Sequence, residues 1–94
     1  MKVKDLVKAL AKVVGSENVL ASPLDLIAYS YDATGKRSLP DMVVFPTSAA
    51  DVSAIVKIAH RHQVPVVARG AGTNLTGGTL PSRGGIILEL SHLN

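Results

Sequence analysis

The sequence predicts a chain of the α+β class with an α/β-like core, in which N-terminal helices precede a small three-stranded parallel sheet. Three observations lead to this prediction. Apolar residues recur at helical spacing in residues 3–14. Residues 42–68 read as strand, helix and strand in succession, and a third short apolar run occupies residues 85–90.

The composition argues against several classes of protein. Of the 94 residues, 47% are hydrophobic, which is ample material for a packed core. There is no cysteine, so disulfide scaffolds, thiolate metal sites and cysteine nucleophiles are excluded. A net charge of only +3, with two tyrosines and one phenylalanine, is unlike a nucleic-acid reader. Since the sequence shows neither a signal peptide nor an apolar run of membrane-spanning length, we expect a cytoplasmic protein.

Residues 1–40 are predicted to be an N-terminal helical segment. The first helix has an apolar face and a lysine face, and Gly15 ends it. The lysine face is interpreted as solvated rather than membrane-bound, because no interfacial aromatic accompanies it. Ser22 and Pro23 begin a short second helix. Residues 31–40 are expected to form a loop, because turn-forming residues dominate them.

Residues 41–94 are predicted to hold the sheet. A β-branched run at 42–45 ends at Pro46, a helix follows a capping signal at 48–51, and a second strand occupies 64–68. Such a unit gives parallel strands with a right-handed crossover. The run at 85–90 is continuously apolar apart from Glu89, which is typical of a strand that is covered on both faces.

The connection from Arg69 to Gly84 is sixteen residues long and shows neither a helical nor a strand pattern. Six of the eight glycines lie between Gly70 and Gly85. Glycines at the carboxyl end of a parallel strand allow backbone N–H groups to converge on an anion. The residues alone leave two alternatives open, a pyrophosphate-binding loop and a purely structural loop. Arg69 either contacts the anion or holds the carbonyl groups of the loop itself.

Two familiar phosphate-binding motifs do not fit this loop. A dinucleotide fingerprint starting at Gly70 would need its third glycine where Leu75 stands. A P-loop starting at Gly72 would need a lysine where Gly78 stands. Both motifs also require a helix directly after the loop, which Pro81 opposes. The sequence therefore disfavours a kinase-like or NTPase function.

The ordered combination of several segments resembles the FAD-binding domain of the FAD-linked oxidases, of the vanillyl-alcohol oxidase and p-cresol methylhydroxylase type. Its similarity is greatest to the FAD subunit of glycolate oxidase and to the D-lactate dehydrogenases. The segments are YSYDAT at 29–34, FPTS at 45–48, VVARGAGT at 66–73, GG at 77–78 and GIILELS at 85–91. The resemblance implies that residues 41–94 are the first subdomain of a PCMH-type FAD-binding domain, truncated at its C-terminus.

In that family the glycine loop wraps the FAD pyrophosphate, and the resemblance implies a set of cofactor-binding residues. Backbone N–H groups of residues 70–74 would contact the pyrophosphate, the glycines at 77–78 would pass close to the flavin, and the proline after the first strand would lie against the cofactor. The implied set is Pro46, Arg69, Gly70, Ala71, Gly72, Thr73, Asn74, Gly77 and Gly78. Some family members bind flavin covalently through a histidine at the position that Thr73 occupies here, so the expected cofactor is non-covalent FAD.

The function implied by the resemblance is that of the N-terminal part of an FAD-dependent oxidoreductase acting on a 2-hydroxy acid such as glycolate or D-lactate. The catalytic and substrate-binding groups of the family lie in segments outside these residues, so the chain alone is expected to be inactive, with no catalytic residue. Two alternatives stay open. One is a nucleotide-binding half-module that needs a partner chain, and the other is a structural fragment without a ligand.

Five further polar residues call for a functional interpretation. His60 and His62 would point about 160° apart on a helix, so we expect them to share no metal ion. Asp32 and Asp41 flank a loop and are interpreted as solvated turn residues rather than ligand contacts. Glu89, within its apolar strand, points either toward the flavin or to a solvent-exposed edge, and the sequence leaves both open.

Overall fold

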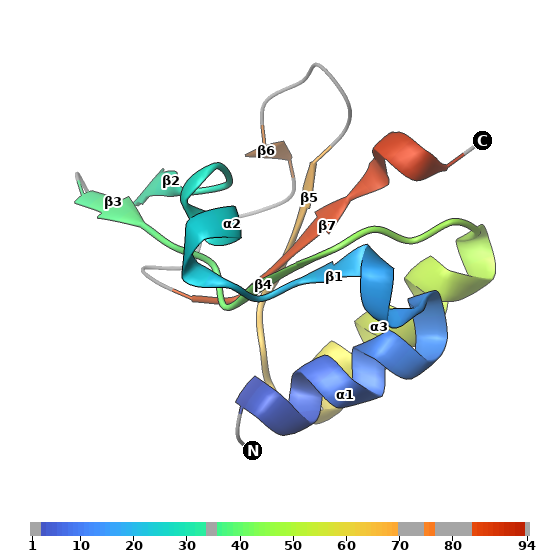
Figure 1. Cartoon of the computed structure of the whole chain (residues 1–94). Coiled ribbons are helices and arrows are strands. Elements are labelled where there is room, and N and C mark those ends of the chain that lie inside the picture. Colours follow the sequence, from blue (N-terminus) through green and yellow to red (C-terminus); the bar gives the residue numbers. More distant parts are fainter. Residues whose placement is uncertain (1–2, 34–35, 70–74, 77–83, 94) are drawn as a thin grey trace.

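The computed structural model describes residues 3–33, 36–69, 75–76 and 84–93 of the chain. The helices are α1 (Val3–Val14), α2 (Pro23–Ile27) and α3 (Ala49–Arg61), with 3₁₀ turns η1 (Ser16–Asn18) and η2 (Leu90–His92). The strands are β1 (Val19–Leu20), β2 (Tyr31–Ala33), β3 (Lys36–Ser38), β4 (Met42–Val44), β5 (Val66–Arg69), β6 (Leu75–Thr76) and β7 (Ile86–Glu89). Figure 1 shows α1 and α3 together on one side of the sheet, with α2 and the β2–β3 hairpin away from them.

The main sheet has five strands in the order β1-β4-β7-β5-β6. Strands β4, β7 and β5 are parallel, which confirms the predicted three-stranded parallel core. The sheet extends beyond that core, because the short strands β1 and β6 pair antiparallel at its two edges. The last strand in the sequence, β7, therefore lies between the two strands that precede and follow α3.

Two expectations for the connecting segments were wrong. Residues 31–40 are not simply a loop, because β2 and β3 pair as an antiparallel hairpin that forms a separate sheet. The connection after β5 is not free of strand either, since Leu75 and Thr76 pair with Arg69 and Ala68. In both cases backbone pairing occurs in residues that lack an apolar alternation, so the sequence pattern did not indicate it.

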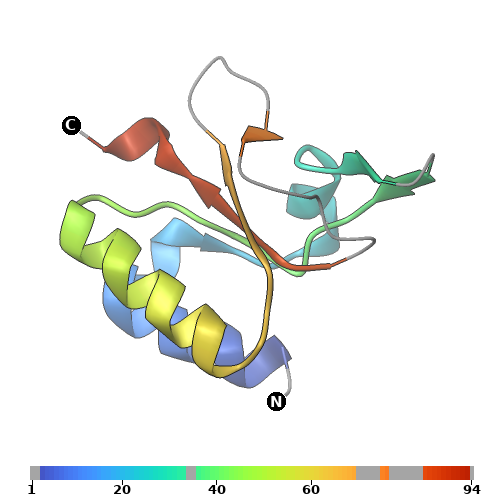
Figure 2. The same cartoon turned by 180° about the vertical axis from the view of Figure 1, so that it is seen from behind.

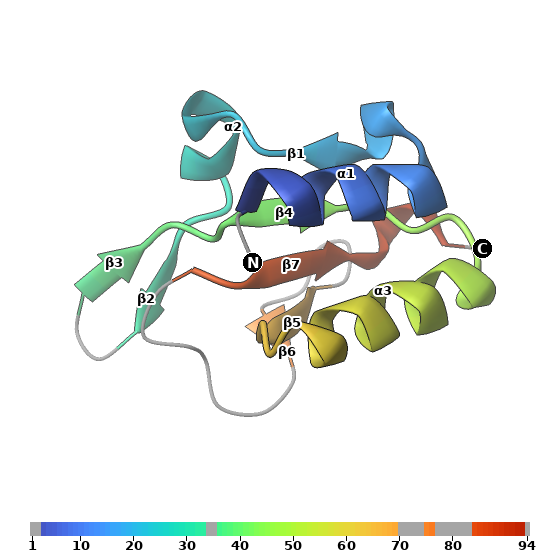
Figure 3. The same ribbon diagram turned by 90° about the horizontal axis from the view of Figure 1, so that it is seen from below.

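The larger hydrophobic core lies between the sheet and the two long helices. Helix α1 buries Leu6, Leu10 and Val14 and ends at Gly15, whose φ of 95° suits a residue without a Cβ. Helices α1 and α3 lie side by side and run in opposite directions (Figures 2 and 3). The nine buried residues of this cluster are Leu6, Leu10, Val14, Met42, Val44, Ile55, Ala59, Ile86 and Leu88.

The start of α3 is fixed by two reciprocal side-chain caps, as the capping signal predicted. The Asp51 N–H donates to Ser48 Oγ at 3.2 Å. The N–H and the hydroxyl of Thr47 donate to Asp51 Oδ2 at 3.1 and 3.0 Å. These bonds satisfy donors that a helix end leaves open, and they set the direction in which the chain leaves β4.

The opposite face of the sheet carries a smaller cluster. It is formed by Leu26 of α2 with Val43 and Ile87, and by the partly buried Leu20, Tyr29 and Phe45. Helix α2 spans only five residues and leaves Leu24 81% and Ile27 56% exposed. Among the described residues this face is therefore covered much less completely than the α1–α3 face.

The entry into β7 is held by Asp41, just before β4. Asp41 N–H donates to the Gly85 carbonyl at 2.8 Å, and Gly85 N–H donates to Asp41 Oδ2 at 2.9 Å. Gly84 has φ +68°, and a Cβ at that position would lie 2.8 Å from Asp41 Oδ2. Asp41 is half-buried, so the expectation of a solvated turn aspartate was wrong for this residue. Its carboxylate instead anchors the end of the glycine-rich connection.

We predict that the α1–α3 core carries much of the stability. Ile55→Ala should cost about 2 to 5 kcal/mol of unfolding free energy, because it leaves a cavity between α3 and the sheet. Val56→Ala, at a side chain 45% exposed on the same helix, is the matched control and should stay within about 0.5 kcal/mol. Denaturant unfolding followed by circular dichroism measures both, and equal losses would contradict this packing.

We also predict that Gly84→Ala destabilises the protein more than Gly15→Ala does. Both substitutions place a Cβ at positive φ, which costs about 1 to 2 kcal/mol. At Gly15 the added Cβ meets the flexible Glu17 side chain, whereas at Gly84 it meets a carboxylate that is itself hydrogen-bonded. In an Asp41→Ala background the excess cost of Gly84→Ala should fall by about 1 kcal/mol. An unchanged excess in that double-mutant cycle would mean that Asp41 is not the obstacle.

Candidate functional site

The candidate site lies at the carboxyl end of the parallel strands, where the glycine-rich loop leaves β5 directly after Arg69. Arg69 and Glu89 are register partners in the β5–β7 pair, and Val44 and Leu88 are partners in the β4–β7 pair. In-register residues of neighbouring strands share a face, and alternate residues return to it. Phe45, Glu89 and Arg69 thus form a row across the sheet, on the face that α2 covers.

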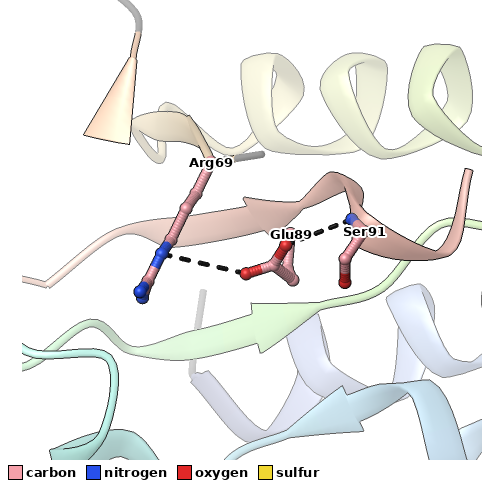
Figure 4. Close-up of polar contacts among 3 residues, drawn as sticks. All are labelled: Arg69, Glu89 and Ser91. Carbon is pink, nitrogen blue, oxygen red and sulfur yellow. Dashed lines mark hydrogen bonds and ion pairs between the residues drawn. The ribbon is translucent and has the colours of Figure 1, made fainter. Parts of the chain in front are cut away.

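Among the described residues, Glu89 is the charged residue that is buried, with 6% of its surface exposed. Its Oε1 accepts a hydrogen bond from Ser91 N–H at 3.1 Å. Its Oε2 lies 3.9 Å from Arg69 Nε (Figure 4). The solvent-edge interpretation of Glu89 is therefore wrong, because the carboxylate is buried and paired. A buried carboxylate requires such partners, since its desolvation is costly.

Arg69 is held from two sides but keeps part of its surface accessible. Its side chain is 35% exposed, and its Cζ lies 5.3 Å from the centroid of the Tyr29 ring. Tyr29 in turn meets Phe45 edge to face, with centroids 6.2 Å apart and planes at 82°. Figure 4 shows the tip of the guanidinium extending beyond the Glu89 carboxylate. Arg69 is therefore a partly exposed cation in a defined place.

Among the described residues, the Arg69 side chain has an ion pair with Glu89 and an aromatic contact with Tyr29. The 3.9 Å approach to Glu89 is longer than a hydrogen bond, so it is an ion pair at a distance. The contact with Tyr29 is a cation–π contact with the face of the ring, with the guanidinium Cζ 5.3 Å from the ring centroid. Toward the described residues the N–H donors of Arg69 thus remain available for an acceptor, such as an anion.

The structure places two of the predicted cofactor-binding residues. Arg69 ends β5, and Pro46, which lies two residues after the end of β4, is fully buried. The others, Gly70, Ala71, Gly72, Thr73, Asn74, Gly77 and Gly78, lie outside the described residues. The predicted cofactor contacts of all nine stay predictions. Sequence reasoning missed the contact of Tyr29 with Arg69, because no local pattern links residues forty positions apart.

The remaining polar residues form no comparable cluster in the described ranges. His60 lies exposed near the end of α3, and His62 is the residue that follows the helix. Across residues 3–33, 36–69, 75–76 and 84–93, no three side chains of metal-ligating type come together. Within the same ranges, none of the helices has the length and apolarity needed to cross a bilayer.

Comparison with known proteins agrees with the predicted resemblance. Residues 40–94 match the family described as "FAD binding domain". Glycolate oxidase subunit GlcD of Bacillus subtilis is 44% identical over 95 residues, which covers 100% of this chain and 20% of the relative. The Danio rerio protein named probable D-lactate dehydrogenase, mitochondrial, is 35% identical over 92 residues, covering 97% of this chain and 18% of the relative. The chain thus spans about a fifth of the length of these relatives.

Solved structures show the same architecture. Substrate-bound p-cresol methylhydroxylase superposes with a TM-score of 0.75 at 25% identity, covering 95% of this chain and 18% of that one. Alkyldihydroxyacetonephosphate synthase, at 20% identity, shares the fold with a TM-score of 0.74 and covers 98% of this chain and 21% of its own. The predicted fold class and family are confirmed, and the chain belongs to the FAD-binding domain family of the FAD-linked oxidoreductases.

Proposed function

We propose that this chain supplies the pyrophosphate-binding part of the FAD site in an oxidoreductase that oxidises a 2-hydroxy acid of the glycolate or D-lactate type. The observation that carries the pyrophosphate assignment is the position of Arg69. A partly exposed guanidinium lies at the end of β5, at the residue where the glycine-rich loop begins. The substrate class is supported by the names of the relatives, glycolate oxidase subunit GlcD and D-lactate dehydrogenase.

The described residues fit FAD by charge and by access. The pyrophosphate of FAD carries negative charge, and Arg69 offers N–H donors that its contacts with Glu89 and Tyr29 do not use. The site lies outside the carboxyl ends of parallel strands, where α/β sheets commonly bind ligands. Gly70 and Gly72 follow directly, and glycines permit close approach of backbone N–H groups to a phosphate.

In this proposal the chain binds and orients the cofactor. Arg69 and the backbone of residues 70–74 hold the pyrophosphate, and the glycines at 77–78 allow the loop to pass close to the flavin. When bound, FAD supplies a hydride acceptor for oxidation of the substrate. Thr73 provides no histidine for a covalent link, so the cofactor is held non-covalently. No catalytic residue is assigned to this chain, and we expect the 94 residues alone to be inactive.

The second candidate is a nucleotide-binding half-module that needs a partner chain. The thin cover over the α2 face favours it, because Leu24 is 81% and Ile27 56% exposed. The two candidates differ in whether one polypeptide carries the catalytic groups. Sequencing the coding DNA on both sides of these residues decides between them.

We predict that Gly72→Asp weakens FAD binding by about tenfold or more, because a carboxylate in the loop repels the pyrophosphate. The measurement is a titration of the FAD-free whole protein with FAD, followed by flavin fluorescence. Ser53→Asp, which adds the same charge at an exposed position on α3, is the control and should leave the affinity unchanged. FMN lacks the pyrophosphate bridge, so its binding should respond less to Gly72→Asp. Unaltered FAD affinity in Gly72→Asp would refute the loop assignment.

A further inference from the structure

We propose that Glu89 is a positioning residue for the cofactor, which holds the Arg69 guanidinium in the orientation that the pyrophosphate requires without touching the cofactor itself. Tyr29 completes the arrangement through a cation–π contact with the guanidinium. This inference rests on the proposed function, since it concerns the same site. It assigns a role to two residues outside the predicted set of cofactor contacts.

The first support is the presence of a carboxylate where packing favours an apolar residue. Glu89 follows Ile86, Ile87 and Leu88 in the central strand, and all four residues are buried. A carboxylate at such a position lowers stability unless it is paired and hydrogen-bonded. Its partners are the Ser91 N–H at one oxygen and Arg69 at the other. Pairing with Arg69 is thus the feature that a hydrophobic residue at position 89 would not provide.

The second support is the geometry of the pair. Ser91 N–H fixes Oε1, so Oε2 is the oxygen directed toward Arg69 (Figure 4). The closest guanidinium atom is Nε, the one nearest the backbone, at 3.9 Å. An end-on bidentate salt bridge would instead occupy the two outer NH₂ groups. The observed contact therefore orients the arginine and leaves those outer donors for another acceptor.

The third support is the aromatic contact on the other side. The guanidinium Cζ lies 5.3 Å from the centroid of the Tyr29 ring, and the edge-to-face contact with Phe45 restrains the ring itself. A cation–π contact restricts the position of the guanidinium but supplies no hydrogen-bond acceptor in the plane of its N–H groups. An arginine side chain loses rotamer freedom when it binds a ligand, and orienting it beforehand reduces that entropic cost.

Positioning and simple electrostatics predict opposite effects of neutralising Glu89. A negative charge beside the pyrophosphate repels it, so removing that charge alone would strengthen FAD binding. If Glu89 instead orients Arg69, removing its charge releases the guanidinium and weakens FAD binding. The sign of the change therefore separates the two roles.

The experiment is a double-mutant cycle on the FAD-free whole protein, titrated with FAD under flavin fluorescence. Glu89→Gln keeps an oxygen for the Ser91 N–H and removes the charge that faces Arg69. We expect it to weaken FAD binding about three- to tenfold with Arg69 present, and less than about twofold in an Arg69→Met background. Tighter binding in Glu89→Gln, or an equal loss in both backgrounds, overturns the proposal.

A second pair of variants tests the arrangement without altering the buried carboxylate. Tyr29→Phe retains the ring and should bind FAD as the wild type does, whereas Tyr29→Leu should weaken binding about threefold or more. Equal affinity of the two variants for FAD contradicts a role for the ring. Circular dichroism melts of each variant show that the protein remains folded at the titration temperature.

Failure of this inference is distinguishable from failure of the proposed function. If Gly72→Asp abolishes FAD binding while the Glu89–Arg69 cycle shows no coupling, the pyrophosphate site stands and the positioning role is wrong. If the wild type shows no preference for FAD over FMN and Gly72→Asp has no effect, the proposed function itself is wrong.

Discussion

Strand β7 lies in the centre of the sheet, hydrogen-bonded to β4 on one side and to β5 on the other, and the rest of the structure depends on this placement. It contributes Ile86 and Leu88 to one hydrophobic cluster and Ile87 to the other. At its amino end it brings Gly85 to Asp41, and at its carboxyl end it brings Glu89 to Arg69. The same strand thus joins the two hydrophobic layers and defines both ends of the glycine-rich connection.

The parallel pairing of β5 with β7 explains why this connection is long. Neighbouring parallel strands cannot be joined by a tight turn, because the chain must return from the carboxyl end of one strand to the amino end of the next. In this fold α3 makes that return between β4 and β5, whereas the glycine-rich segment makes it between β5 and β7. Arg69 lies where this connection leaves the carboxyl end of β5.

Sequence patterns predicted the elements that carry a distinct set of apolar residues. Helices α1 and α3 show a helical period, and the parallel strands β4, β5 and β7 lie in short, nearly continuous apolar runs. The two-residue strands β1 and β6 and the β2–β3 hairpin did not follow from the pattern. They are held by backbone pairing, which is nearly independent of side-chain type, and two residues are too few to show a period.

The candidate site was predictable in its location but not in its contacts. The glycines that cluster after a parallel strand indicated that the site lies at the carboxyl end of β5. The contacts of Arg69 with Glu89 and Tyr29 required the tertiary fold, because they depend on the position of β7 and on the packing of the segment after α2. The alternatives left open for Glu89 reflect this limit, since strand periodicity assigns a face but not a partner.

The two ends of the glycine-rich connection are both held by carboxylates, and the difference between them bears on function. The Asp41 N–H donates to the Gly85 carbonyl, and the Gly85 N–H donates to Asp41 Oδ2, so this carboxylate is engaged by the backbone of the connection itself. Glu89 instead pairs with a long cationic side chain that retains accessible donors. Of the two ends, the one that begins at Arg69 therefore offers a partly exposed cation, the group suited to an anion. Asp41 thus anchors one end of the connection, whereas the end that begins at Arg69 is the one at which we propose that the cofactor binds.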